Sequence, residues 1–231
     1  MKHLLLTTIA AVVLVGCGES QQSAPTPELK PIARVAGAKA PDISIHDAAN
    51  KGNIEAVKEH LAAGTEVDAK NKSGSLPLHI AAEKGHKEIV ELLIANGANV
   101  EARESSSTFP INENGGIPLH NAASSGHLKI AELIISKGAN VNAKDGDGYT
   151  PLHYCAFWGW SELSKLLIIK GADVNARSNI GKTPLDEIIE GTKMKSLSVD
   201  EKFSLRDLPA TADLLRKHGG KTGEELKAEG K

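Results

Sequence analysis

The stretch Thr150-Pro151-Leu152-His153-Tyr154-Cys155-Ala156 decides the fold of this chain, because it returns at regular intervals. The histidines of four copies stand at positions 46, 79, 120 and 153, and Asp186 takes the corresponding place in a fifth. The spacings are therefore 33, 41, 33 and 33 residues. A period of this length predicts a solenoid of stacked helical units. The related segments begin at Ile45, Pro77, Pro118 and Thr183.

Each copy predicts two helices joined by a tight turn. Thr150-Pro151 is a favourable helix start, because threonine can cap free amides and proline suits the first helical position. A glycine six residues after each histidine, such as Gly159, ends the first helix. The second helix carries an apolar stripe that only a neighbouring copy can bury. The columns of that stripe are Ile89, Ile130 and Leu163; Leu93, Ile134 and Leu167; and Ile94, Ile135 and Ile168.

The motif T-P-L-H-x-A at a period of 33 resembles the ankyrin repeat, and the resemblance covers residues 42–220. It implies an all-α repeat fold, an ankyrin solenoid of helix-turn-helix units with hairpin fingers, in about five copies. Two insertions interrupt the pattern, near 104–111 and 193–209. Because end copies face solvent, we expect a more polar outer side on the first copy, where His60 occupies the column of Leu93. Residues 221–231 form a charged tail, and we expect its last residues, 227–231, to fray.

The N-terminus carries features of an export signal. Leu4–Val15 is an apolar run too short to span a bilayer, and it follows a basic start. Leu14-Val15-Gly16-Cys17 resembles the lipobox of bacterial lipoproteins, which implies a signal peptide over 1–16 and lipidation of Cys17. An ordinary signal peptide that contains a cysteine is the alternative. Residues 17–41 would then be the lipidated cysteine and a flexible tether. The expected location is the outer membrane, facing the periplasm.

Composition excludes several classes of function. Counting from Cys17, the chain holds 26 basic and 29 acidic residues, a net charge of −3, since residues 1–16 contain one lysine and no acid. No basic stripe is apparent, so we expect no nucleic-acid partner. The two cysteines, Cys17 and Cys155, offer no disulfide framework. We expect a monomer whose membrane contact is made through the Cys17 anchor only.

The nine histidines do not predict a metal site or a catalytic site. Four recur once per copy at a helix start, and His86 and His127 recur in the turn between helices, as structural residues do. In the ankyrin family the helix-start imidazole hydrogen-bonds the adjacent backbone. Cys155 replaces a small alanine, which favours a buried hydrophobe over a reactive thiol. No nucleophile–base pair and no phosphate loop is present, so we expect neither an enzyme nor a cofactor.

The resemblance implies a partner that binds through finger tips and the exposed side of the first helices. The fourth copy places Tyr149, Tyr154, Phe157 and Trp158 at those variable positions. An aromatic cluster on a surface is typical of an interface hot spot. The alternative is that the insertion near 193–209 covers Trp158 and Trp160. Further candidate partner-binding residues are Asn121, Ser124 and Ser125 in the third copy and Phe109 in the first insertion.

These observations favour a non-enzymatic envelope scaffold or inhibitor that binds a protein on its concave face. Bacterial ankyrin lipoproteins can resemble immunity proteins, so an immunity-type neutraliser of a periplasmic toxin is one concrete version. A purely structural spacer is a second hypothesis, and an enzyme or small-molecule binder with a pocket between the two insertions is a third. The sequence does not identify the partner, because a fold does not fix its function.

Overall fold

A computed structural model describes residues 30–105, 115–197 and 207–230, with the side chains of 194–197 left out. Within these ranges the secondary structure is eleven helices and no strands. The helices are α1 (Ile45–Lys51), α2 (Ile54–Ala62), α3 (Pro77–Lys84), α4 (Lys87–Ala95), α5 (Pro118–Ser125), α6 (Leu128–Ser136), α7 (Pro151–Trp158), α8 (Ser161–Ile169), α9 (Pro184–Leu197), α11 (Leu208–Lys217) and α12 (Gly223–Ala228). The expected all-α solenoid is confirmed.

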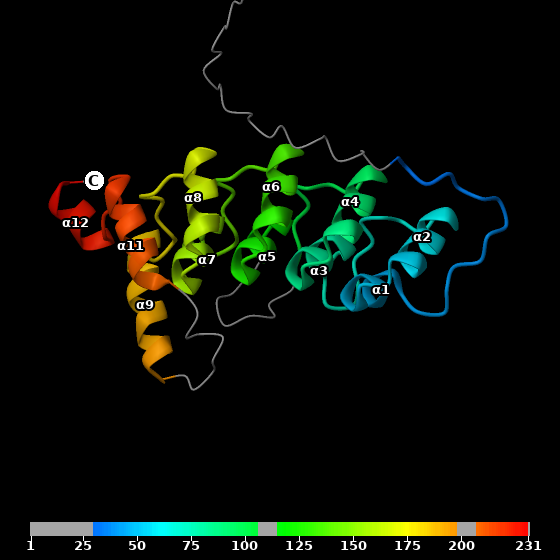
Figure 1. Ribbon diagram of the computed structural model, residues 1–231, viewed down its shortest axis with the longest axis horizontal. Coiled ribbons are helices and arrows are strands. Elements are labelled where there is room, and N and C mark those ends of the chain that lie inside the picture. The colour runs from blue at the N-terminus through cyan, green and yellow to red at the C-terminus, as the bar shows by residue number, and fades with distance from the viewer. Residues whose placement is uncertain (1–29, 106–114, 198–206, 231) are drawn as a thin grey trace, which may run out of the picture.

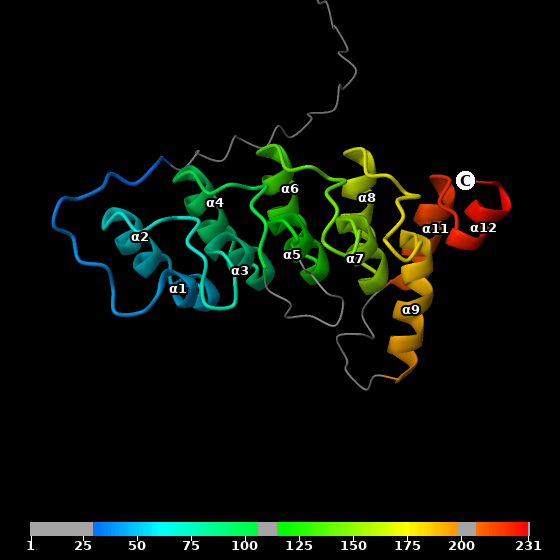
Figure 2. The same cartoon turned by 180° about the vertical axis from the view of Figure 1, so that it is seen from behind.

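The helices form two rows that run along the molecule (Figure 1). The inner row is α1, α3, α5, α7 and α9, and the outer row is α2, α4, α6, α8 and α11. Each repeat contributes one helix to each row, and the chain then crosses to the next repeat through a finger. Figure 2 shows the same order from behind. In α9 the inner helix is 14 residues long rather than 8, and its far end projects beyond the other helices (Figure 1).

The core follows the predicted columns. Ile89, Ile130 and Leu163 are at most 2% exposed, and the column of Leu93, Ile134 and Leu167 is fully buried. The third column, Ile94, Ile135 and Ile168, is only partly buried and packs against the edge of the core. Stacking therefore buries two columns completely, which makes neighbouring repeats depend on each other for stability.

The histidine at the start of each inner helix links its repeat to the next. His46 donates from Nε2 to the carbonyl of Ala69 at 2.7 Å, and His153 donates to that of Lys182 at 3.1 Å. His120 accepts the Ile117 amide at Nδ1, 3.1 Å away, and its Nε2 lies 3.1 Å from Ala143 O. Burial lowers the pKa of His79, His120 and His153 to about 4. These imidazoles are neutral structural donors near pH 7.

A second family of links lies in the turn between helices. His86 and His127 reach back to the carbonyls of Asn50 and Glu83 at 3.2 and 2.9 Å. Trp160 takes this role in the fourth repeat, because its Nε1 donates to the carbonyl of Ser124 at 3.1 Å. Its ring lies on Gly126, where an added Cβ would come within 2.6 Å of the indole. Trp160 is thus a stacking residue.

The N-terminal end differs from the expected tether. Ile32 donates its amide to Asn96 Oδ1 at 2.8 Å, and Val35 donates its amide to the carbonyl of Ala62 at 2.9 Å. Ile32 and Ile43 pack against the core. Residues 30–44 therefore form a strap across the ends of α2 and α4, and a flexible tether over all of 17–41 is wrong for residues 30–41. Residues 1–29, including Cys17, lie outside the described ranges.

The strap also corrects the expectation for His60. This side chain is 5% exposed, so it does not give the first repeat a polar outer surface. Its Nε2 donates to the carbonyl of Ile43 at 2.7 Å, and its Nδ1 lies 3.1 Å from Thr65 Oγ1. A histidine in an apolar column is accommodated because both ring nitrogens find partners. His60 holds the strap to the first repeat.

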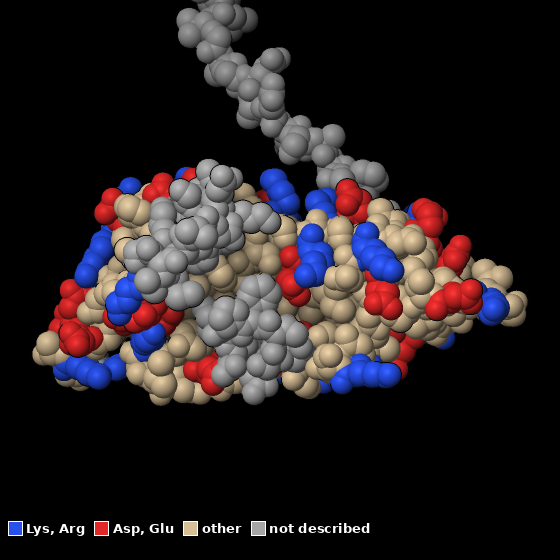
Figure 3. All heavy atoms as spheres, turned by 90° about the horizontal axis from the view of Figure 1, so that it is seen from below, with Lys and Arg blue, Asp and Glu red and all other residues tan. Residues whose placement is uncertain are grey.

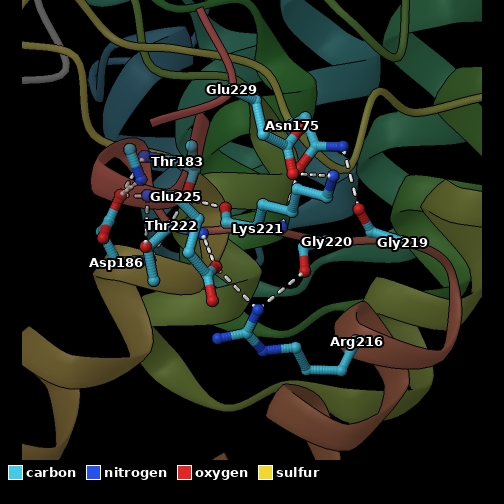
Figure 4. Close-up of polar contacts among 11 residues, drawn as sticks. Asn175, Thr183, Asp186, Arg216, Gly219, Gly220, Lys221, Thr222, Glu225 and Glu229 are labelled. Atoms are coloured by element: carbon cyan, nitrogen blue, oxygen red, sulfur yellow. Dashed lines mark hydrogen bonds and ion pairs between the residues drawn. The ribbon is translucent and has the colours of Figure 1, made fainter. Parts of the chain in front are cut away.

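The C-terminal end is closed by a reversal of hydrogen-bond polarity (Figure 4). Asp186 replaces the repeat histidine and, as a carboxylate, accepts rather than donates. Its Oδ2 accepts the amides of Thr183 and Gly223, both at 2.8 Å. Gly223 begins α12, and an added Cβ there would lie 2.5 Å from the carbonyl of Gly181. The short helix α12 thus covers the last finger.

The expected fraying of the tail is therefore wrong as far as residue 230. Thr222 and Glu225 cap the start of α12 reciprocally, with Thr222 N donating to Glu225 Oε2 at 2.7 Å and Glu225 N donating to Thr222 Oγ1 at 3.2 Å. Leu226 is 6% exposed, and Arg216 of α11 donates to Glu225 Oε2 at 2.7 Å (Figure 4). The charged residues lie on the outside of a packed helix.

Candidate protein-binding face

The structure divides the predicted partner-binding residues into buried and half-buried groups. Four are buried: Tyr154 is 1% exposed, Asn121 3%, Ser124 6% and Phe157 7%. The expectation that these four side chains are exposed at the surface is wrong. Three are half-buried and keep part of their surface: Tyr149, Trp158 and Ser125. Phe109 lies outside the described residues.

Tyr154 is buried because it is bonded to the base of its own finger. Its hydroxyl donates to Asp145 Oδ2 at 2.6 Å, and its ring stands edge-on to His120 with centroids 5.8 Å apart. The other oxygen of Asp145 accepts the amides of Asp147 and Tyr149 at 3.0 and 2.8 Å. Burial raises the pKa of Asp145. Tyr154 therefore fixes the finger to α7.

Asn121 makes the equivalent hydrogen bond in the third repeat. Its Nδ2 donates to Glu104 Oε1 at 3.0 Å, and Glu104 occupies the finger position that Asp145 holds one repeat later. Glu104 is 4% exposed, and burial raises its pKa to about 7. Ser124 donates to the carbonyl of Asn121 at 3.0 Å, within α5. The residue after each of these histidines thus makes its hydrogen bond within the protein.

Phe157 is covered where α9 approaches α7. An added Cβ at Gly191 of α9 would lie 2.2 Å from the carbonyl of Phe157, so only glycine permits this distance between the helices. Phe157 and Trp158 meet edge-on, with centroids 4.9 Å apart. The alternative that the insertion covers Trp158 falls in part on residues 198–206, which lie outside the described ranges. Trp158 itself remains half-buried.

Tyr149 lies at the end of its finger between α7 and α9. Its ring stands edge-on to His153 and to Tyr154, with centroids 5.3 and 6.2 Å away. Burial, with the nearby Glu187 carboxylate as a smaller cause, raises the pKa of Tyr149 to about 12. Glu187, which no sequence signal marks, is 3% exposed, and its Oε1 lies 3.5 Å from Lys182 Nζ. Tyr149 is therefore a neutral, oriented phenol.

Charge on this side of the molecule is mixed. Figure 3 shows acidic and basic side chains interspersed on the face seen from below, with no large field of one sign. The positions that correspond to Trp158 carry Lys51, Lys84 and Ser125 in the first three repeats. The fourth repeat therefore places an indole where the first two repeats have lysines and the third has a serine.

In the parts of the chain that the structure describes, no three His, Cys, Asp or Glu side chains come together where they could hold a metal ion. Cys155 is a buried free thiol, and burial raises its pKa. No helix in residues 30–105, 115–197 or 207–230 is both long and apolar enough to cross a membrane.

Comparison with known proteins agrees with the repeat architecture. A family model of ankyrin repeats, which comprises three copies, matches residues 45–145 and again 104–178. The two matches together cover more than half of the 231 residues. No curated protein matches the chain. Ankyrin repeats are in general non-enzymatic modules for binding other proteins. The chain belongs to the ankyrin-repeat family.

Proposed function

We propose that this chain is a membrane-anchored binding module of the bacterial envelope, whose protein partner docks on the inner face of the fourth repeat. The observation that carries the docking site is the pair of half-buried aromatic residues, Tyr149 and Trp158. Both are oriented by buried neighbours and keep exposed surface. Rigid aromatic side chains of this kind contribute much of the binding energy of protein interfaces.

The buried residues support the site from beneath. Tyr154 and Asp145 fix the finger that carries Tyr149, and Phe157 packs edge-on against Trp158. A surface held in this way loses little side-chain entropy when a partner binds. The partner is a folded protein, and a net charge of −3 from Cys17 onward favours one of basic character. Such a module acts as a scaffold or as an inhibitor, including an inhibitor of a periplasmic toxin.

The anchor is the second half of the proposal. The apolar run Leu4–Val15 and the lipobox-like Leu14–Cys17 support export followed by acylation of Cys17. The outer membrane, facing the periplasm, is the proposed location. Replacing Cys17→Ser should move the protein from the membrane fraction to the soluble fraction. Recovery of the variant in the membrane fraction, at the level of the unchanged chain, would contradict the anchor.

The docking site is tested by affinity capture from solubilised envelope with residues 18–231 as bait. Three further baits carry Trp158→Ala, Tyr149→Ala and Lys51→Ala, and Lys51 is the matched control because it holds the position of Trp158 in the first repeat. Circular dichroism first establishes that every bait is folded. We expect one protein to be retained by the unchanged and Lys51→Ala baits and lost from the two aromatic variants.

The binding constant of the retained protein then decides the proposal. Truncation of a hot-spot aromatic costs about 2 kcal/mol or more, which is roughly a thirtyfold loss of affinity. Equal affinity for all four baits would refute the fourth-repeat site. Capture of no protein by any bait would favour the structural spacer instead.

A further inference from the structure

The strap determines where the chain leaves the folded domain. The start of the described chain lies beside the end of α4, at the edge where the outer helices finish (Figure 1). Ile32 is bonded to Asn96 and Val35 to Ala62, and these two residues end α4 and α2. The strap thus places the start of the described chain at one edge, whereas α9 projects from the opposite edge (Figures 1 and 2).

We define the glycine-turn edge as the turns that follow the outer helices, residues 62–66, 95–99, 136–140 and 169–173. At Gly97, Gly138 and Gly171 an added Cβ would meet nothing within 4 Å, so these three turns are open. The first turn is covered by the strap, since the Arg34 side chain would lie 3.7 Å from a Cβ at Gly64. The edge is therefore an accessible surface at the point from which the chain departs.

The composition of this edge is apolar and basic. Four large apolar residues of the described chain are well exposed, and two of them lie here: Ile169 at 68% and Val35 at 58%. The exposed cations of the edge and strap are Lys30, Arg34, Lys39, Lys137 and Lys170, against the exposed acids Asp42, Glu66 and Asp173. An excess of cations beside exposed apolar side chains occurs here in a chain that is acidic overall.

We propose that the glycine-turn edge is a second membrane contact, which lies against a bilayer bearing anionic phospholipid headgroups. This inference rests on the proposed anchor at Cys17. Each cation near such a surface raises the affinity of a protein for the membrane about fivefold. Exposed apolar side chains insert at the boundary between the headgroups and the acyl chains. The inner row and the projecting end of α9 then face away from the membrane, towards a soluble partner.

Two positions at opposite edges test the inference in the full lipidated chain. Lys170→Cys places a fluorophore on the glycine-turn edge, and Lys51→Cys places one on the opposite edge, where α1 ends. Cys155 is buried and stays unlabelled, which labelling of the unchanged chain checks. Each variant is reconstituted in vesicles of phosphatidylethanolamine and phosphatidylglycerol that contain a lipid with a nitroxide headgroup.

We expect the label at position 170 to be quenched at least about threefold more than that at 51, since the two edges stand about one helix length apart. Arg34→Glu with Lys137→Glu should bring this ratio towards one, whereas Lys72→Glu at a finger tip should leave it unchanged. Flotation of the unchanged chain with equal quenching at both positions overturns the membrane contact and leaves the anchor standing. Failure of the chain to float overturns both.

Discussion

The third and fourth repeats share one backbone plan and use it for different surfaces. In both, the residue after the repeat histidine reaches an acid at the base of the finger: Asn121 reaches Glu104, and Tyr154 reaches Asp145. The positions that keep solvent contact then differ, since the third repeat shows Ser125 where the fourth shows Trp158. The comparison teaches that the position after the histidine is internal in these repeats, and that recognition is left to the residues around it.

The largest expected effect concerns what the two repeats share, their neutral buried histidines. The pKa values of His79, His120 and His153 are lowered to about 4 from 6.5, so below pH 6.5 the unfolded chain binds protons that the folded chain does not. Stability is therefore lost as pH falls from 6.5 to 4. The loss is up to about 3 kcal/mol per histidine, and about 5–15 kcal/mol is typical of a whole domain.

Urea unfolding at several pH values measures this loss. We expect the urea concentration at the unfolding midpoint to fall steadily as the pH is lowered from 6.5 to 4. Protonation of Glu104 over the same range should offset a smaller part of this loss of stability. His120→Gln and His153→Gln should each reduce the pH dependence by a similar amount, although each also lowers stability at pH 7. A midpoint that stays constant down to pH 4 would show that these imidazoles are not neutral and buried.

The next effect tests whether the two repeats share a core. Leu119→Ala and Leu152→Ala remove equivalent, fully buried side chains from α5 and α7. Each substitution should cost about 2–5 kcal/mol of unfolding free energy, and the two costs should be similar. Thermal and chemical unfolding provide the measurement. A cost below about 1 kcal/mol in one repeat alone would mean that its inner helix packs differently from the other.

Tyr154→Phe tests the internal role of the residue after the histidine. The substitution leaves Asp145 Oδ2 without the phenol that lies 2.6 Å away, in a buried site. We expect a loss of about 1–2 kcal/mol in stability and little change in partner affinity. Urea unfolding and a binding titration separate the two quantities. Unchanged stability with a tenfold loss of affinity would instead place Tyr154 in the interface.

Glu104→Gln is expected to have an effect similar in size to that of Tyr154→Phe, but of the opposite sign. Burial raises the pKa of Glu104 to about 7, so its contribution to stability is full below pH 4.5 and is lost as pH rises through 7. A neutral amide avoids that loss. The variant should therefore be about 1–2 kcal/mol more stable than the unchanged chain at pH 8 and nearly equal to it at pH 4.5. A variant that is less stable than the unchanged chain at pH 8 would show that the Glu104 carboxyl is not buried with a raised pKa.

The sequence predicted those features that repeat. The helix pairs, the apolar columns and the linking histidines follow from the 33-residue period, because each copy meets the same neighbours. Two further structural signals lie in the sequence. Trp160 aligns with His86 and His127, which indicates a stacking residue, and Thr222 with Glu225 has the spacing of a capping box.

The ends and the inner face were harder to predict, because they depend on contacts without a period. Nothing in the polar segment before residue 42 marks Ile32 as a partner of the first repeats. The burial of Tyr154 depends on a bond to Asp145 that closes only when the finger folds back. The burial of Asn121, Ser124, Tyr154 and Phe157 was therefore not predicted from the sequence.

The central claim is that a partner meets the fourth repeat at Trp158. The most direct measurement is photo-crosslinking in intact cells, with a photoreactive amino acid placed at position 158 and, in a second strain, at the corresponding position 51. A discrete adduct of one partner at position 158 that is absent at position 51 is the result we predict. The same adduct at both positions, or at 51 alone, would contradict the claim.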